Sequence, residues 1–143
     1  MEAKFDDYAQ DAKRFIDTVA VELGTPGDAD HAYRVTQAVL QSIRNHIPIE
    51  ESMEMIAQLP MILKAMYVNG WRINKERRRY ESREELLKAV CKEADRTEHA
   101  DFQHNCKGAV QAVLRTIKIY VDADELVDVR GQMPEEIAEL MYA

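Results

Sequence analysis

The chain has 143 residues and a net charge of −7, with 31% charged residues, 46% hydrophobic residues, 5 glycines and 4 prolines. This length is the commonest size of a single domain, and the composition is that of a folded rather than a disordered chain. So few glycines and prolines favour long helices over many short strands. No apolar run approaches the roughly 20 residues of a membrane-spanning helix, so we expect no membrane association.

The first two helices are predicted from apolar residues at helical spacing. Apolar residues recur at steps of three and four over Phe5–Leu23, and Gly24 is a natural terminator of that helix. Asp28 or Asp30 can then cap a second helix, which must end before Pro48.

Two shorter helices are predicted next. Glu50 and Glu51 suit the positive end of a third helix, which we expect to break rather than bend at Pro60. The amide of Gln58 can pair with a carbonyl that this break leaves free. A fourth helix then covers Met61–Tyr67.

An internal repeat is the strongest signal in the sequence. A shift of 74 residues gives eight identities in the 37 residues from His31 to Tyr67, without a gap. These identities cover both a helix and the Gln-x-Pro break, which a chance match would not keep in one register. They pair Gln37 with Gln111, Ala38 with Ala112, Val39 with Val113, Leu40 with Leu114, Ile43 with Ile117, Glu51 with Glu125, Gln58 with Gln132 and Pro60 with Pro134.

The second copy has the same predicted order of helices. Its first helix covers Leu86–Ala94, and its second carries the apolar stripe from Phe102 to Tyr120, with Asp101 as the N-cap. Asp122 and Glu125 form a plausible capping box for the next helix. We therefore predict an all-α, single-domain bundle of about six to eight helices built from two tandem pseudo-symmetric repeats. The repeats cover residues 5–69 and 82–143 and are joined by a basic linker at residues 70–81.

The two cysteines, Cys91 and Cys106, have neither CxxC nor metal-binding spacing. Each falls on the apolar stripe of a predicted helix. We expect both to be small buried thiols in a reducing cytosol. The N-terminus lacks the basic and apolar regions of a signal peptide, so the expected location is the cytoplasm.

With the repeat defined, the chain resembles the bacterial family known as domain of unknown function 2267. The resemblance covers nearly the whole chain, from about Phe15 to Met141. It implies an all-helical fold of two related halves and brings no activity or cofactor. The stretches that carry it are Gln58–Lys64, Tyr67–Trp71, Ser82–Val90 and Asp128–Pro134.

Polar clusters do not form a recognisable catalytic or metal-binding motif. His99, Asp101 and His104 lie close together, but their spacing matches no known zinc pattern. Acidic residues gather at predicted helix starts, where the helix dipole favours them. No phosphate-binding loop or nucleophile motif is present, so we expect no cofactor and no metal and lean away from an enzyme.

Four methionines, Met53, Met55, Met61 and Met66, lie in the third and fourth helices. Methionine fills gaps where helix junctions pack, which is the simpler interpretation. The alternative is an adaptable groove for a partner helix.

The linker is the main candidate for interaction. Six basic and two acidic residues between Asn69 and Arg83 give that stretch a net charge of +4, so the rest of the chain carries −11. Trp71 is expected to pack between the halves. The leading hypothesis is a non-enzymatic module that binds an acidic protein partner through the linker, or a partner in the cleft between the halves. The alternatives are nucleic-acid binding through the linker, which the acidic body disfavours, and a small ligand between the halves. The candidate residues are Trp71, Arg72, Lys75, Arg77, Arg78 and Arg79.

Overall fold

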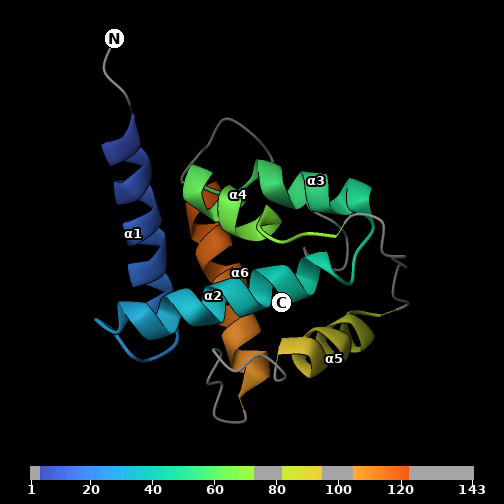
Figure 1. Cartoon of the computed structure of the whole chain (residues 1–143). Coiled ribbons are helices and arrows are strands. Elements are labelled where there is room, and N and C mark those ends of the chain that lie inside the picture. Colours follow the sequence, from blue (N-terminus) through green and yellow to red (C-terminus); the bar gives the residue numbers. More distant parts are fainter. Residues whose placement is uncertain (1–3, 73–81, 95–104, 123–143) are drawn as a thin grey trace.

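The computed structural model describes residues 4–72, 82–94 and 105–122, which form six α-helices and no strand (Figure 1). The prediction of an all-α fold is therefore confirmed. Any further helices of the second copy would lie in residues 123–143, outside the described part of the chain. The six helices are α1 (Phe5–Glu22), α2 (Ala29–Arg44), α3 (Ile49–Ala57), α4 (Met61–Val68), α5 (Arg83–Ala94) and α6 (Cys106–Asp122).

The turn between α1 and α2 follows the predicted chemistry. Gly24 has a φ of 81°, a left-handed conformation that favours glycine, and its N–H donates to the carbonyl of Val21. The N–H of Thr25 donates to the carbonyl of Ala20 at 2.9 Å, which completes a Schellman motif. Asp28 then caps α2, because its Oδ1 accepts a hydrogen bond from the N–H of the third residue along.

The chain breaks between α3 and α4, as predicted. Pro60 is the N-cap of α4 with a φ of −58° and a ψ of 156°, so the two helices are separate rather than one kinked helix. Lys64 on α4 reaches back and donates from Nζ to the carbonyl of Ile56 at 2.9 Å. A lysine thus satisfies a carbonyl at the end of α3, while the role suggested for the amide of Gln58 stays a prediction.

Helices α2 and α6 form the centre of the core. The eight described residues of α6 that are buried each lie 74 positions after a buried residue of α2. This agreement includes polar residues, since Ser42 and Thr116 are both buried. The repeat itself stays a prediction, because the rest of the second copy lies in residues 123–143.

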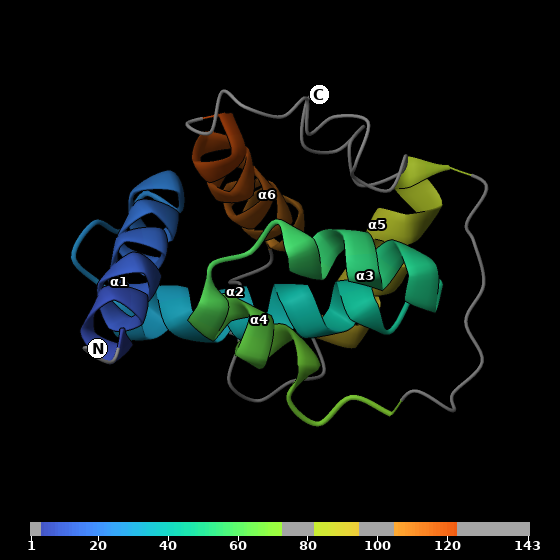
Figure 2. The ribbon, with the colours of Figure 1, turned by 90° about the horizontal axis from the view of Figure 1, so that it is seen from above.

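The first helix of each predicted half packs across onto the other half. Helix α1 contacts α6, and α5 contacts α2, so contacts cross the position of the linker in both directions. Figure 2 shows α1 at one end of α2 and α5 at the other, with α6 between them. One polar tie at this crossing joins Asn45, after α2, to the carboxylate of Glu93 on α5 at 3.0 and 3.1 Å.

Side chains of α2 donate hydrogen bonds to the backbone carbonyls at the C-terminal end of α4. Arg44 is only 6% exposed, and its Nη1 donates to the carbonyls of Tyr67 and Asn69 at 2.8 and 2.7 Å. Gln41, one turn earlier on α2, donates from Nε2 to the carbonyl of Met66 at 3.0 Å. Because the last carbonyls of a helix have no partner within the helix, these side chains satisfy groups that would otherwise be buried unpaired.

No helix within the described ranges has the length and apolar composition needed to cross a membrane.

Candidate functional site

A hollow of about 330 Å³ lies between α1, α2 and α4. This volume is at the small end of the roughly 300–1,000 Å³ of ligand pockets. It suits one or two apolar side chains of a partner, or a small ring compound. All of its lining residues belong to the first predicted repeat, so the hollow is not the cleft between halves that the sequence suggested.

Short side chains create this hollow. Ala9 and Ala12 of α1 and Ala29 of α2 line it. Because each alanine carries only a methyl group, these positions leave space that larger side chains would fill. Leu63 and Met66 on α4, 0% and 7% exposed, line it from another side. The sequence signal for this site was the presence of alanines on the apolar faces of α1 and α2. Periodicity alone did not distinguish these alanines from those of ordinary helix packing.

The edge of the hollow combines charge with exposed apolar surface. Lys13 and Asp17, one turn apart on α1, and Asp30 on α2 are all exposed lining residues. Tyr33 is 49% exposed and Ile62 is 38% exposed, which is high for apolar side chains. The hollow therefore offers an apolar interior beside two carboxylates and one ammonium group.

The methionines of α3 and α4 divide into two classes. Met55 and Met66 are 0% and 7% exposed and belong to the core. Met53 and Met61 are 58% and 47% exposed. The core-packing interpretation therefore describes one pair, while the other pair adds apolar surface to α3 and α4.

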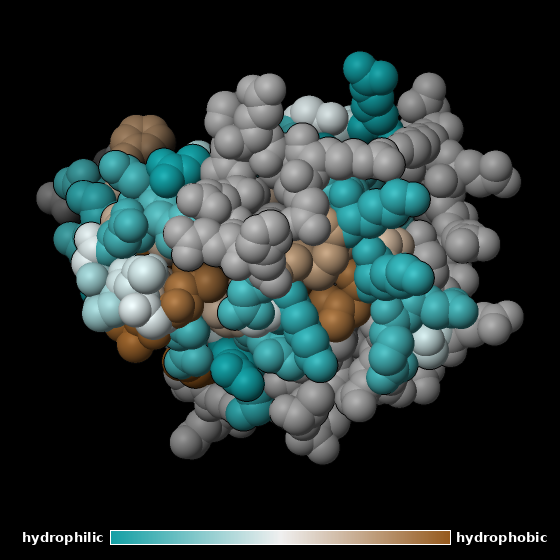
Figure 3. All heavy atoms as spheres, turned by 90° about the horizontal axis from the view of Figure 1, so that it is seen from below, coloured by the Kyte–Doolittle hydropathy of each residue, from teal (hydrophilic) through white to brown (hydrophobic). Residues whose placement is uncertain are grey.

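Exposed apolar residues also occur elsewhere on the molecule. On the face shown in Figure 3, brown apolar residues lie in separate patches between hydrophilic residues. The hollow differs from such patches because α1, α2 and α4 give it depth.

Only the start of the predicted basic linker is described. The ring of Trp71 contacts that of Tyr67 edge to face, with the centroids 6.0 Å apart, so Trp71 packs at the C-terminal end of α4. Arg72 is exposed. The other candidate residues lie outside the described residues; they are Lys75, Arg77, Arg78 and Arg79. Binding of a partner by the linker stays a prediction.

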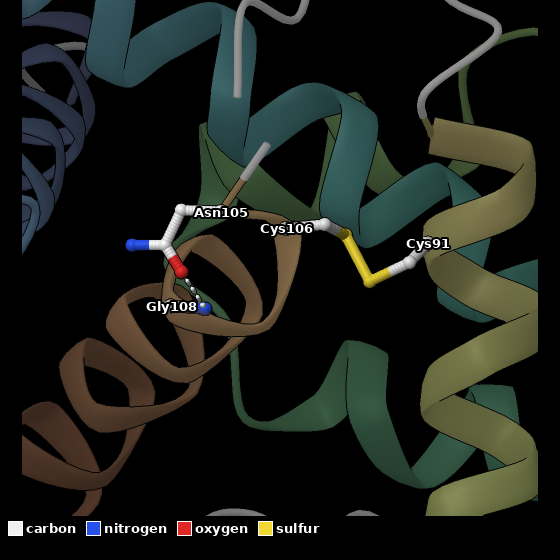
Figure 4. Close-up of a disulfide and its surroundings, with 4 residues drawn as sticks. All are labelled: Cys91, Asn105, Cys106 and Gly108. Carbon is white, nitrogen blue, oxygen red and sulfur yellow. Dashed lines mark hydrogen bonds between the residues drawn. A yellow bond between two sulfur atoms is a disulfide. The ribbon is translucent and has the colours of Figure 1, made fainter. Parts of the chain in front are cut away.

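The two cysteines form a disulfide, so the expectation of two free thiols is wrong. Cys91 on α5 and Cys106 at the start of α6 are bonded, with their Cα atoms 5.7 Å apart (Figure 4). Each lies on the apolar stripe of its helix, as predicted, but the two stripes meet where α5 contacts α6. The spacing of the two cysteines in the sequence does not show that they are close in space, because that proximity depends on how α5 and α6 cross.

The disulfide lies beside the N-cap of α6. Asn105 caps this helix through Oδ1, which accepts a hydrogen bond from the N–H of Gly108 at 3.2 Å (Figure 4). The prediction that Asp101 caps this helix is therefore wrong. A Cβ at Gly108 would lie 2.6 Å from the Nδ2 of Asn105, so the absent side chain is what lets the asparagine fold over the first turn.

The histidine cluster of the sequence, His99, Asp101 and His104, lies outside the described residues. Among the residues that the structure describes, no group of three metal-ligating side chains comes together. The described His46 lies 3.9 Å from the carboxylate of Glu93, at the junction of α2 and α5.

A family model described as "Uncharacterized conserved protein (DUF2267)" matches residues 12–140. No curated protein matches the chain.

Proposed function

We propose that this chain, which belongs to the DUF2267 family of uncharacterised conserved proteins, is a non-enzymatic module. It binds a protein partner in the α1–α2–α4 hollow. The observation that carries this proposal is the hollow itself, an apolar cavity that opens beside exposed Tyr33 and Ile62. Exposed apolar surface around a depression is typical of protein-interaction sites.

The partner is expected to be an amphipathic helix with one large apolar anchor. A single leucine, methionine or phenylalanine side chain fits a hollow of about 330 Å³. Asp17 and Asp30 at the edge favour lysine or arginine beside that anchor, and the acidic body adds to this preference.

The basic linker is a second proposed contact, for an acidic surface of the partner. Its support is the +4 charge between Asn69 and Arg83 in a chain of net charge −7. Nucleic acid is the rival occupant, and a small apolar ligand is the rival for the hollow. The family resemblance supports a bacterial protein, and we propose the cytoplasm as its location.

The test of the hollow is to fill it. Ala9→Phe places a ring where Ala9 lines the hollow, while Gln10→Phe places the same ring on the neighbouring exposed position of α1, which does not line it. Partners are captured by cross-linking in cells and identified by mass spectrometry for both variants. We expect Ala9→Phe to lose a partner that Gln10→Phe and the unmodified chain retain. Equal recovery with both variants would remove the hollow from the proposal.

The linker and the rival ligands need separate measurements. Replacement of Arg77, Arg78 and Arg79 by glutamine should weaken capture of an acidic partner and lower its salt dependence. Fluorescence anisotropy with labelled DNA and RNA at low salt tests the nucleic-acid rival, which tight binding would support. Native mass spectrometry of protein purified from cells tests for a small bound ligand.

A further inference from the structure

We propose that Cys91 and Cys106 form a reversible thiol–disulfide exchange site, which low-molecular-weight thiols open and low-molecular-weight disulfides close while the chain stays folded. The bond joins α5 to the start of α6 (Figure 4). Cys106 belongs to the core, and Cys91 is only partly buried against it. This site is independent of the hollow, since none of its residues lines that cavity.

The exchange is a balanced two-electron reaction. A thiolate such as glutathione attacks the sulfur of Cys91, the S–S bond breaks, and Cys106 leaves as a thiolate that takes up a proton. A second glutathione then attacks the mixed disulfide and releases Cys91 as a thiol. The products are two protein thiols and one glutathione disulfide, and the reverse reaction closes the bond.

The direction of attack follows from the positions of the two residues. Cys106 is 8% exposed, whereas Cys91 is the more exposed of the pair, so an external thiolate has better access to Cys91. Exchange is faster when the leaving thiolate is stabilised. Cys106 is the sulfur that leaves in this direction.

The start of α6 stabilises that leaving thiolate. Cys106 is the first residue of α6, directly after its cap Asn105, so it lies at the positive end of the helix dipole. The N–H groups of the first turn have no carbonyl partners within the helix. The exposed ammonium group of Lys107 is next in the chain. Reactive cysteines are typical of such electropositive helix starts.

Opening the bond leaves most of the core in place. Helix α6 has eight buried described residues, and it contacts both α1 and α2 without the help of the disulfide. The described buried residues of α5 are Leu86 and Val90, each 1% exposed. Reduction therefore affects α5 more than α6, and the C-terminal turn of α5 is then held by the contact between Glu93 and Asn45. The expected result is local loosening of α5 in an otherwise folded chain.

The experiment equilibrates the full chain in glutathione buffers of varied thiol-to-disulfide ratio, without denaturant. Free thiols are trapped by alkylation and counted by mass spectrometry, while circular dichroism follows helix content. We expect complete, reversible opening with retained helix, and faster hydrogen exchange in α5 but not in α6. A bond that opens only in denaturant, or an opening that unfolds the whole chain, would make the disulfide a structural staple and overturn the proposal.

A matched pair of charge variants tests the role of the helix start. Lys107→Gln removes the ammonium group next to Cys106, and Arg115→Gln removes an exposed charge farther along the same helix. We expect Lys107→Gln to slow opening by glutathione on the order of 2–5-fold, as a local charge effect predicts, and Arg115→Gln to leave it unchanged. Equal rates in both variants would contradict the proposal that charge at the start of α6 stabilises the leaving thiolate of Cys106.

Discussion

The guanidinium of Arg44, on α2, lies 2.8 Å from the backbone carbonyl of Tyr67 at the C-terminal end of α4 and donates a hydrogen bond to it. Both side chains are almost fully buried, at 6% and 0% exposed. The hydroxyl of Tyr67 in turn pairs with Ser52 of α3 at 2.8 Å. One buried tyrosine thus connects α2, α3 and α4, and its position depends on the cation beside it.

We expect Arg44→Met to lower the free energy of unfolding by about 3 kcal/mol, the upper value for hydrogen bonds to a charged group, because it removes the donor and leaves buried carbonyls unpaired. Arg44→Lys should lose less, since an ammonium group can still reach one of the two carbonyls. Arg34→Met, on an exposed position of α2, is the control and should change stability by less than about 0.5 kcal/mol. Urea unfolding measures all three, and an equal loss for Arg44→Met and Arg34→Met would contradict this role.

Lys64→Met should lower the free energy of unfolding by about 1 kcal/mol, because the carbonyl of Ile56 loses the Nζ donor that closes the end of α3. Methionine keeps the length of the apolar stem, so packing changes little. Hydrogen exchange should become faster at the end of α3, relative to the unmodified chain, and should change less in the other helices. A uniform change over all helices would show that Lys64 has no specific role at the Pro60 break.

Gly108→Ala should change stability differently in two backgrounds. In the unmodified chain the new methyl group displaces Asn105, and the lost cap, worth about 1 kcal/mol, offsets the gain in helix propensity of up to about 1 kcal/mol. In an Asn105→Ala background no cap remains to lose, so the same substitution should stabilise the protein. Thermal unfolding of the unmodified chain, the two single variants and the double variant measures this coupling. The same effect of Gly108→Ala in both backgrounds would show that the cap contributes nothing.

The double substitution Cys91→Ser with Cys106→Ser should lower the free energy of unfolding by about 3 kcal/mol, the loop-closure value for the sequence separation of 15. Alkylated reduced protein should lose a similar amount. Urea unfolding of the oxidised, reduced and double-serine forms measures the loss. If the oxidised form were no more stable than the double variant, the bond would not constrain the unfolded chain as this interpretation requires.

Burial raises the pKa of Tyr120 above its ordinary value of 10.0, and the hydrogen bond with Thr18 opposes this shift. The ring packs against Phe15, with the centroids 5.4 Å apart. Because the folded state holds the proton more tightly, its stabilising contribution is present below the ordinary pKa and is lost as the pH rises through the raised pKa. The difference in tyrosinate absorbance between the unmodified chain and Tyr120→Phe should give a midpoint above 10.0. A midpoint below that value would contradict the shift.

The described helices agree closely with the sequence predictions where local chemistry determines them. Gly24 ends α1, Asp28 caps α2 and Pro60 separates α3 from α4, each for a reason contained in the residue itself. The start of α6 differs from the prediction, because Asn105 rather than Asp101 caps this helix. The linker candidates Lys75 and Arg77–Arg79 and the second half of the repeat stay predictions.

Three properties follow from the amino-acid sequence: the chain is helical, the helices of its first half have defined ends, and the chain belongs to the DUF2267 family. These properties depend on neighbours within one or two turns, so periodicity and capping chemistry are enough to predict them. The packing of the helices was needed to show that Cys91 meets Cys106 and that Met53 and Met61 are exposed while Met55 and Met66 are buried. It also decided that three alanines on two helices border one hollow. These facts depend on how the helices cross, and each apolar stripe is compatible with many crossings.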